Sequence, residues 1–103
     1  MQDELLLQYL KMVCSGKKNM ITGKALEMRL HISGNELRRR IHRLRCRGLP
    51  IAATRRGYFY AENAAELYAT ILQLKKLRDG TDKAISGLEA AMERFGEPGG
   101  RSG

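Results

Sequence analysis

The spacing of hydrophobic and polar positions predicts an amphipathic helix at the start of the chain. Within residues 3–15 the apolar side chains recur as the buried face of a helix requires. They belong to Leu6, Leu7, Leu10, Val13 and Cys14. Asp3 and Glu4 stand at the positive end of this helix, where carboxylates are favourable. Gly16 lies in the polar loop that follows and is suited to closing the helix.

Residues 22–34 predict a short helix and a tight turn. The Thr22 hydroxyl can accept from the free backbone N–H groups of a first helical turn. The helix then runs to about Leu30, and the turn follows as His31-Ile32-Ser33-Gly34. Ile32 is the apolar residue of this turn, so we expect it to fill the gap between this helix and the next.

A third helix, over residues 34–47, separates apolar from basic residues. Ser33 precedes it as N-cap, and Glu36 completes a capping box in which each side chain satisfies the other residue's backbone donor. At about 100° per residue, the core face carries Leu37, Ile41 and Leu44. The opposite face carries Asn35, Arg39, His42, Arg43 and Cys46, flanked by Arg38 and Arg45 on one side and by Arg40 and Arg47 on the other.

A short β-hairpin is predicted after this helix. Gly48-Leu49-Pro50 ends the helix, and residues 50–54 and 58–61 are β-prone. Between them Arg55-Arg56-Gly57 predicts a loop of three residues in which Gly57 takes the positive φ. Tyr58 and Tyr60 alternate on one face of the hairpin, and core packing explains them better than base stacking does.

This order of elements predicts a winged helix-turn-helix, a mainly α fold with a small β-hairpin, the wing. In such a fold the second helix of the turn motif enters the DNA major groove. A brief strand at Met20-Ile21 is expected to join the wing. The predicted fold therefore makes double-stranded DNA the expected partner.

The charge distribution favours the same partner. The chain has 19 basic and 11 acidic residues, a formal net charge of +8. Residues 24–57 hold ten Lys or Arg against Glu27 and Glu36, while the rest of the chain has nine basic and nine acidic residues, so the whole net charge lies in one third of the sequence. A solvated charged helix face is the ordinary alternative, but the coincidence with a turn motif and a wing favours a polyanion.

The basic helix and the wing supply the candidate DNA contacts. Arginine can form a bidentate pair with guanine and asparagine with adenine, so we expect Asn35 and Arg39, on the first turns, to read bases. We expect phosphate contacts from Lys24, Arg38, Arg40, Arg43, Arg45 and Arg47. At the wing tip, Arg55 and Arg56 suit a minor groove or phosphate contact.

A resemblance rests on the run ITGKALEMRLHISGNELRRRIHRLRCRGLPI, followed by a Gly-Tyr that begins the last strand. This run resembles the helix-turn-helix domain of the biotin-operon repressor and of DeoR-type regulators, over roughly residues 5–61. The chain is also similar to small prophage-encoded winged-helix proteins that carry a helical tail. The resemblance implies DNA binding. Because no ligase or effector-binding domain follows, it implies no biotin or sugar sensing.

The residues after Asn63 follow a different pattern. Asn63 can cap a helix that begins at Ala64. Along this helix one set of positions, most of them apolar, recurs at alternating intervals of four and three residues, which is the spacing of a coiled-coil-like heptad seam. The seam is Leu67, Ile71, Leu74, Arg78, Thr81, Ile85, Leu88, Met92 and Phe95. We expect one continuous helix, because a single internal glycine, Gly80, costs only about 1 kcal/mol. The alternative is a helical hairpin that turns at Gly80.

These patterns predict three parts of the chain. Residues 1–62 form the winged helix-turn-helix domain, residues 63–95 a C-terminal dimerisation helix, and residues 96–103 a disordered tail without apolar residues. The apolar seam needs a partner, and a second copy of the chain is the simplest one. The expected dimerisation residues are Leu67, Ile71, Leu74, Ile85, Leu88, Met92 and Phe95.

Other chemistry finds little support in the sequence. Neither histidine has a nucleophile or paired carboxylate at a suggestive spacing, so we expect no enzyme activity. His42 and Cys46 are one helical turn apart, but a zinc site needs three or four ligands, so we expect no metal, no cofactor and no small-molecule ligand. Without a long apolar run or a signal peptide, we expect no membrane and a cytoplasmic location, with Cys14 and Cys46 as reduced thiols.

The sequence therefore predicts a homodimeric, sequence-specific DNA-binding protein, a small transcriptional or phage-type regulator. One alternative is a replication or packaging accessory that binds DNA with low sequence preference. The other is a protein–protein interaction module that acts through its heptad helix.

Overall fold

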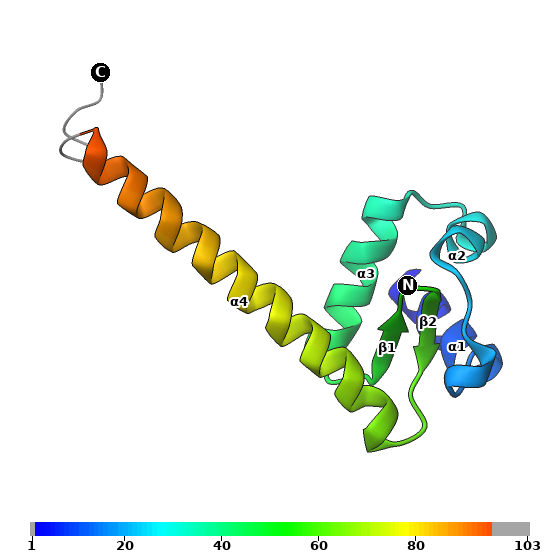
Figure 1. The fold of residues 1–103 in the computed structure, drawn as a ribbon. Coiled ribbons are helices and arrows are strands. Elements are labelled where there is room, and N and C mark those ends of the chain that lie inside the picture. Colours follow the sequence, from blue (N-terminus) through cyan, green and yellow to red (C-terminus); the bar gives the residue numbers. More distant parts are fainter. Residues whose placement is uncertain (1, 96–103) are drawn as a thin grey trace. The chain divides into compact units, whose positions relative to one another are not determined.

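The computed structural model describes residues 2–95, and the predicted disordered tail, residues 96–103, lies outside them. Helices and one hairpin follow each other as predicted (Figure 1). They are α1 (Gln2–Val13), a 3-10 turn η1 (Lys17–Asn19), α2 (Gly23–Leu30), α3 (Gly34–Cys46), β1 (Ile51–Thr54), β2 (Gly57–Tyr60) and α4 (Ala64–Arg94). The mainly helical fold with a small hairpin and a long C-terminal helix is thereby confirmed.

The chain divides into two compact units, Met1–Thr70 and Ile71–Gly103. The first contains the helix-turn-helix, the hairpin and the first two turns of α4. The second contains the remainder of α4. The predicted domain limits, residues 1–62, 63–95 and 96–103, stay a prediction.

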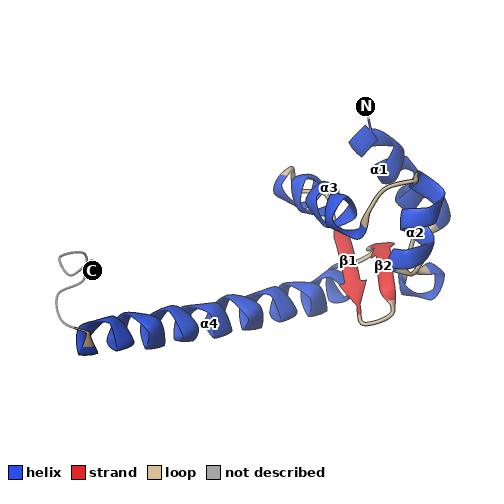
Figure 2. Ribbon diagram, turned by 90° about the horizontal axis from the view of Figure 1, so that it is seen from above, coloured by secondary structure: helices blue, strands red, loops and turns tan. Residues whose placement is uncertain are grey.

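The core of the first unit lies where α1, α2 and α3 meet on one side of the hairpin (Figure 2). The core face predicted for α3 is confirmed, because Leu37, Ile41 and Leu44 are all buried. In α1 the prediction was wrong for Val13, which is 53% exposed. The helix ends there, and Cys14 turns inward in its place.

The hairpin is antiparallel, and its register pairs Ile51 with Tyr60 and Thr54 with Gly57. The strand expected at Met20-Ile21 is reduced to one bridge, in which Ile21 N donates to Tyr58 O at 2.9 Å and Tyr58 N donates to Ile21 O at 2.8 Å. The segment before α2 therefore covers the free edge of β2.

The prediction for Gly57 was wrong in its reason. The register leaves a two-residue loop, Arg55 and Arg56, and Gly57 lies in β2 without a positive φ. The loop is held by Thr54 Oγ1, which accepts from Arg56 N at 3.0 Å. Glycine is needed because a Cβ at residue 57 would overlap the backbone carbonyl of Ile21 and lie 3.0 Å from Cα of Thr22.

The end of α3 confirms the predicted role of Gly48. This residue has φ 88°, the left-handed region that favours glycine. Gly48 N donates to Arg45 O at 2.9 Å, and Leu49 N donates to Leu44 O at 3.1 Å. These two bonds are those of a Schellman motif, so the last carbonyls of the helix are satisfied before the chain enters β1.

The first turns of α4 belong to the winged domain. The Asn63 cap is confirmed, since Glu66 N donates to Asn63 Oδ1 at 2.9 Å. Thr70 is buried, and its hydroxyl accepts from Ala53 N at 3.0 Å and donates to Ala53 O at 3.3 Å. Leu67 packs against the small cluster formed by Ala52, Phe59 and Ala61. The free edge of β1 is thus closed by the side chain of Thr70.

The described part of the second unit is the uninterrupted remainder of α4. α4 continues through Gly80 to Arg94, so the predicted continuous helix is confirmed and the hairpin alternative is not what the structure has. The apolar seam residues from Ile71 to Phe95 are between 39% and 77% exposed in the single chain. Their role in dimerisation stays a prediction at this point.

Candidate nucleic-acid interface

Local capping fixes the turn between α2 and α3. Thr22 Oγ1 accepts from Ala25 N at 3.1 Å, as predicted, and starts α2. His31 ends α2 in the left-handed conformation, with φ 56° and ψ 48°, and is exposed. Ile32 then packs against the core, and Ser33 Oγ accepts from Glu36 N at 3.1 Å. The first turn of α3 is therefore held in a defined place.

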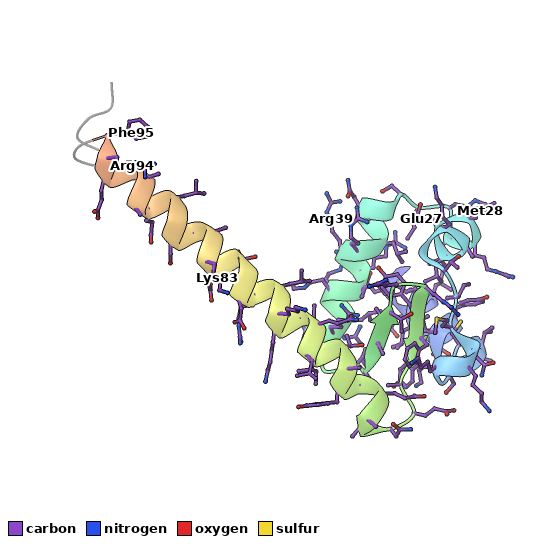
Figure 3. All side chains as sticks on the ribbon, viewed as in Figure 1. Glu27, Met28, Arg39, Lys83, Arg94 and Phe95 are labelled. Atoms are coloured by element: carbon purple, nitrogen blue, oxygen red, sulfur yellow. The ribbon has the colours of Figure 1, made fainter. Side chains whose placement is uncertain are left out.

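Three polar side chains gather at this first turn and face solvent. Asn35, Arg38 and Arg39 are exposed, and the Arg39 side chain keeps 68% of its accessible surface. Arg38 Nη2 donates to Asn35 Oδ1 at 2.6 Å. Figure 3 shows Arg39 pointing away from the hairpin and the core. The predicted base-reading residues thus lie together, on the face of α3 opposite Leu37.

Glu36 is used differently from the prediction. Instead of completing a capping box, its carboxylate accepts from Arg40 Nε at 2.9 Å and from Arg39 Nη1 at 3.3 Å. The hydrogen bond from Arg40 is the main cause that lowers the pKa of Glu36. Two positive charges within one helical turn outweigh a single backbone N–H as partners for this carboxylate.

Arg40 and Arg45 are far less accessible than the other arginines of α3. The Arg40 side chain is 7% exposed and is paired with Glu36. Arg45 Nε donates to Ile51 O at 2.9 Å, and burial lowers the pKa of its guanidinium. Arg45 thus links α3 to β1, whereas the Glu36 partner of Arg40 lies in α3 itself, and the phosphate contacts predicted for both arginines stay predictions.

The acidic start of α1 lies against the C-terminal half of α3. Arg43 donates to both carboxylate oxygens of Asp3 at 2.8 Å, and Arg47 Nη1 donates to Glu4 Oε2 at 3.1 Å. The bidentate bond from Arg43 lowers the pKa of Asp3 and, in turn, the Asp3 carboxylate raises the pKa of Arg43. The positive charge of α3 is therefore least compensated near its N-terminal turns.

The wing brings a second basic group into place, part of which the sequence prediction missed. Arg55 and Arg56 are exposed at the hairpin loop, as expected. Lys17 and Lys18, from η1, line an open hollow of about 500 Å³ together with Arg56 and Thr22. A run of two lysines in a loop gave only a weak signal, because its proximity to the wing depends on the bridge between Ile21 and Tyr58.

Lys24 belongs to α2. It is exposed on the first turn of α2. This exposure suits the phosphate contact predicted for it, which stays a prediction.

Within residues 2–95 no three His, Cys, Asp or Glu side chains are placed to hold a metal ion. Cys46 Sγ lies 3.5 Å from His42 Nε2 on the exposed face of α3. Burial raises the pKa of the other thiol, Cys14. Among the described residues no helix is long and apolar enough to cross a membrane.

The turn motif, the exposed basic helix and the hairpin define a winged helix-turn-helix protein. Comparison with family models agrees: the model described as "HTH domain" matches residues 5–59, and the chain belongs to this helix-turn-helix family. The family supports DNA binding and a regulatory role. Comparison with curated proteins and with solved structures gave no match.

The Asp3–Arg43 pair makes a testable contribution to stability. The pKa of Asp3 lies below its ordinary value of 3.8, so the folded state binds fewer protons than the unfolded chain around that pH. Its contribution is therefore present above about pH 4 and is lost as the pH falls through the lowered pKa. We expect Asp3→Asn to lower the melting temperature at pH 7 by a few degrees or less, and to have less effect at an acid pH below the lowered pKa.

A double-mutant cycle isolates this pair. Asp3→Asn, Arg43→Gln and the double variant are melted at both pH values. A coupling at pH 7 that vanishes at acid pH is the expected result. The same coupling at both pH values would show that packing, and not charge, links the two side chains.

Proposed function

We propose that the chain is a homodimeric regulator that binds double-stranded DNA in a sequence-specific manner through α3, without enzymatic activity. The observation that carries this proposal is the group of exposed side chains at the first turn of α3, Asn35, Arg38 and Arg39. Their amide and guanidinium groups suit the edges of adenine and guanine in the major groove. A small transcriptional or phage-type regulator is the biological role that we infer.

Phosphate contacts in this proposal come from side chains around the reading face. Arg43 and Arg47 keep 48% and 52% of their side-chain surface exposed while paired with α1, so each can reach a phosphate from a fixed position. Lys24, which precedes α3 in the chain, is exposed, and so are the wing arginines Arg55 and Arg56, which follow it. We add Lys17 and Lys18 to this set because they lie beside Arg56.

The proposal is tested first by selecting binding sites from a pool of random duplexes. A specific regulator enriches a defined sequence, and a dimer enriches two half-sites at a fixed spacing. A pool that stays random while binding remains strong would favour the replication or packaging accessory. The absence of DNA binding would favour an interaction module that acts through α4.

Arg39→Ala tests whether α3 reads bases. We expect it to weaken binding to the selected site by about 1–3 kcal/mol and to change binding to random DNA much less, because a bidentate contact to guanine is lost. Affinities for both duplexes are measured by fluorescence anisotropy at one salt concentration. The control is Arg47→Ala, since Arg47 is also exposed and ion-paired but lies at the other end of α3. If Arg39→Ala weakened binding to both duplexes equally, Arg39 would contact a phosphate and would not read a base.

Replacing Arg55 and Arg56 together with alanine tests the wing. We expect weaker binding to every duplex and a decrease of about 1–2 in the slope of log K against log salt concentration, because fewer counterions are released. The loop bond from Arg56 N to Thr54 Oγ1 involves the backbone and is retained in this variant. If the slope keeps its value, the wing does not touch the DNA.

Homodimerisation through the seam of α4 is the remaining part of the proposal. Its support is the row of apolar side chains that a single copy of α4 leaves exposed, among them Leu74, Ile85 and Leu88. Apolar surface repeated along a helix at heptad spacing is buried in soluble proteins by a second helix. A two-fold dimer would also present two copies of α3 to one DNA duplex.

A further inference from the structure

The two sides of the α4 seam differ in chemistry. The positions that follow the seam residues Leu74, Thr81 and Leu88 carry charges; we name Lys75, Asp82 and Glu89 the charged flank. The positions that precede Arg78, Ile85 and Met92 are apolar; we name Leu77, Ala84 and Ala91 the apolar flank. All of them lie within the continuous helix of the second unit, and all but the partly buried Ala91 are exposed.

This asymmetry leads us to propose that two copies of α4 pair in antiparallel orientation, with Arg78 of one copy opposite Thr81 of the other. The same register places Leu74 opposite Ile85 and Ile71 opposite Leu88. The inference rests on the homodimer proposed above and adds its orientation and register.

The flanks argue for the antiparallel orientation. In a parallel coiled coil, positions that follow the seam residues of one set face positions that precede the seam residues of the other set. The charged flank of one copy would therefore lie against the apolar flank of the other. In an antiparallel pair the charged flank of one copy faces the charged flank of the other, and the two apolar flanks face each other. Lys75 then lies beside Asp82 of the second copy, twice by symmetry, and Leu77 lies beside Ala84. Opposite charges meet and apolar surface is covered.

The polar seam positions give the same answer. In a parallel pair Arg78 would face its own symmetry copy within an apolar seam, where two like charges repel and are partly desolvated. In the antiparallel register Arg78 faces the Thr81 hydroxyl instead. Asp82 of the second copy then lies close to both Lys75 and Arg78, and it adds a second carboxylate to Asp79, which lies 3.6 Å from Arg78 in the single chain.

The register is fixed by the same residues. A shift by one heptad in either direction places Arg78 opposite a leucine, Leu88 or Leu74. One shift also brings Asp82 beside its own copy, and the other brings Lys75 beside its own copy. Only the register with Arg78 opposite Thr81 pairs the polar seam residues with each other and places opposite charges beside each other in the charged flank.

The antiparallel register has a consequence for DNA binding. Residue 70, where the winged unit ends, lies level with residue 89 of the second copy, so the two copies of residue 70 are about 28 Å apart along the coil axis at about 1.5 Å per residue. In a parallel coil they would be side by side. The orientation of the coil therefore changes the distance between the points at which the two winged units join it.

Disulfide trapping between two chains that each carry one exposed, engineered cysteine tests the orientation. Both chains carry Cys46→Ser, because Cys46 is exposed and Cys14 is buried. One chain has Leu74→Cys and the other, distinguished by mass, has Ile85→Cys. The chains are mixed in a glutathione redox buffer and their disulfides are counted by mass spectrometry. We expect a several-fold excess of the mixed disulfide over either homodisulfide, because residue 74 faces residue 85 only in an antiparallel pair.

Two other outcomes overturn the inference and can be told apart. Predominant homodisulfides would show a parallel dimer, which leaves the proposed homodimer intact. An absence of any disulfide between chains that remain helical and monomeric in light scattering would remove the dimer and the orientation together.

A charge exchange provides an independent readout of the register. We expect Lys75→Glu to raise the dimer dissociation constant several-fold and the double variant Lys75→Glu/Asp82→Lys to restore it. Lys83→Glu is the matched control, because Lys83 is as far from Asp79 along the helix as Lys75 is and its heptad position lies outside the seam and its flanks. Figure 3 shows the Lys83 side chain extending from α4. A double variant that dimerises no better than Lys75→Glu would overturn the proposed contact.

Discussion

Gly57→Ala is expected to destabilise the winged domain more than alanine at any other described glycine. The new Cβ would overlap the Ile21 carbonyl and press on Cα of Thr22, and both are backbone atoms that cannot rotate away. Relief requires the Ile21–Tyr58 bridge to open, with the loss of two backbone hydrogen bonds. We expect a cost of about 3 kcal/mol or more, which in a domain of this size lowers the melting temperature by roughly 10–20 °C. Thermal unfolding followed by near-ultraviolet circular dichroism of the tyrosines measures it.

Gly87→Ala is the matched control for this variant. A Cβ at residue 87 would meet no atom within 4 Å apart from the backbone of its own helix, and the residue lies in the interior of α4. We expect this change to stabilise the helix by about 0.5–1 kcal/mol, since alanine is the better helix former. A Gly57→Ala protein as stable as the wild type would mean that the segment before α2 can move away from the hairpin at little cost.

The parts of the fold that depend on neighbouring residues could be predicted from the sequence. The Thr22, Ser33 and Asn63 caps act on backbone N–H groups within the next turn, so the local sequence decides them. The buried face of α3 follows from helical periodicity in the same way. Gly48 could be assigned because helix ends commonly require a left-handed residue.

The parts that depend on contacts between distant segments could not. Nothing near Thr70 in the sequence indicates that its hydroxyl closes the edge of β1 at Ala53. The need for Gly57 comes from Ile21, far back in the chain, and was mistaken for a turn requirement. Helical periodicity gave the correct order of residues around α3. It could not show that neighbouring residues bury the side chain of Arg40.

The candidate interface shows the same division. The exposure of Asn35 and Arg39 follows from their place opposite the core face, and this was accessible from periodicity. The pairing of Arg43 with Asp3 joins the beginning of the chain to α3 and changes which part of that helix keeps its positive charge. Lys17 and Lys18 approach Arg56 only in the folded domain. Electrostatics at the interface therefore depends on tertiary contacts that sequence spacing does not encode.

The anchoring of α4 determines how its role in dimerisation should be tested. Deleting everything after residue 63 would also remove Leu67 and Thr70, which pack on the hairpin of the same chain. Loss of DNA binding by such a fragment would be ambiguous, because the winged domain itself would be damaged. A substitution in the second unit leaves those contacts in place.

Ile85→Asp in the full-length chain is expected to separate the dimer and to remove most of its affinity for DNA. The carboxylate would have to be desolvated in an apolar seam, which is unfavourable whichever way the two helices run. A monomer holds one half-site without the high effective concentration of the second α3, so affinity for a two-half-site duplex should fall by about 10²–10⁴-fold, while affinity for a single half-site stays the same. Light scattering at micromolar concentration and anisotropy on both duplexes measure the two effects, and Lys83→Asp, two residues away and outside the seam, serves as control. If Ile85→Asp remained dimeric, or if it bound both duplexes as the wild type does, the seam of α4 would not be the surface that brings two copies of α3 to the DNA.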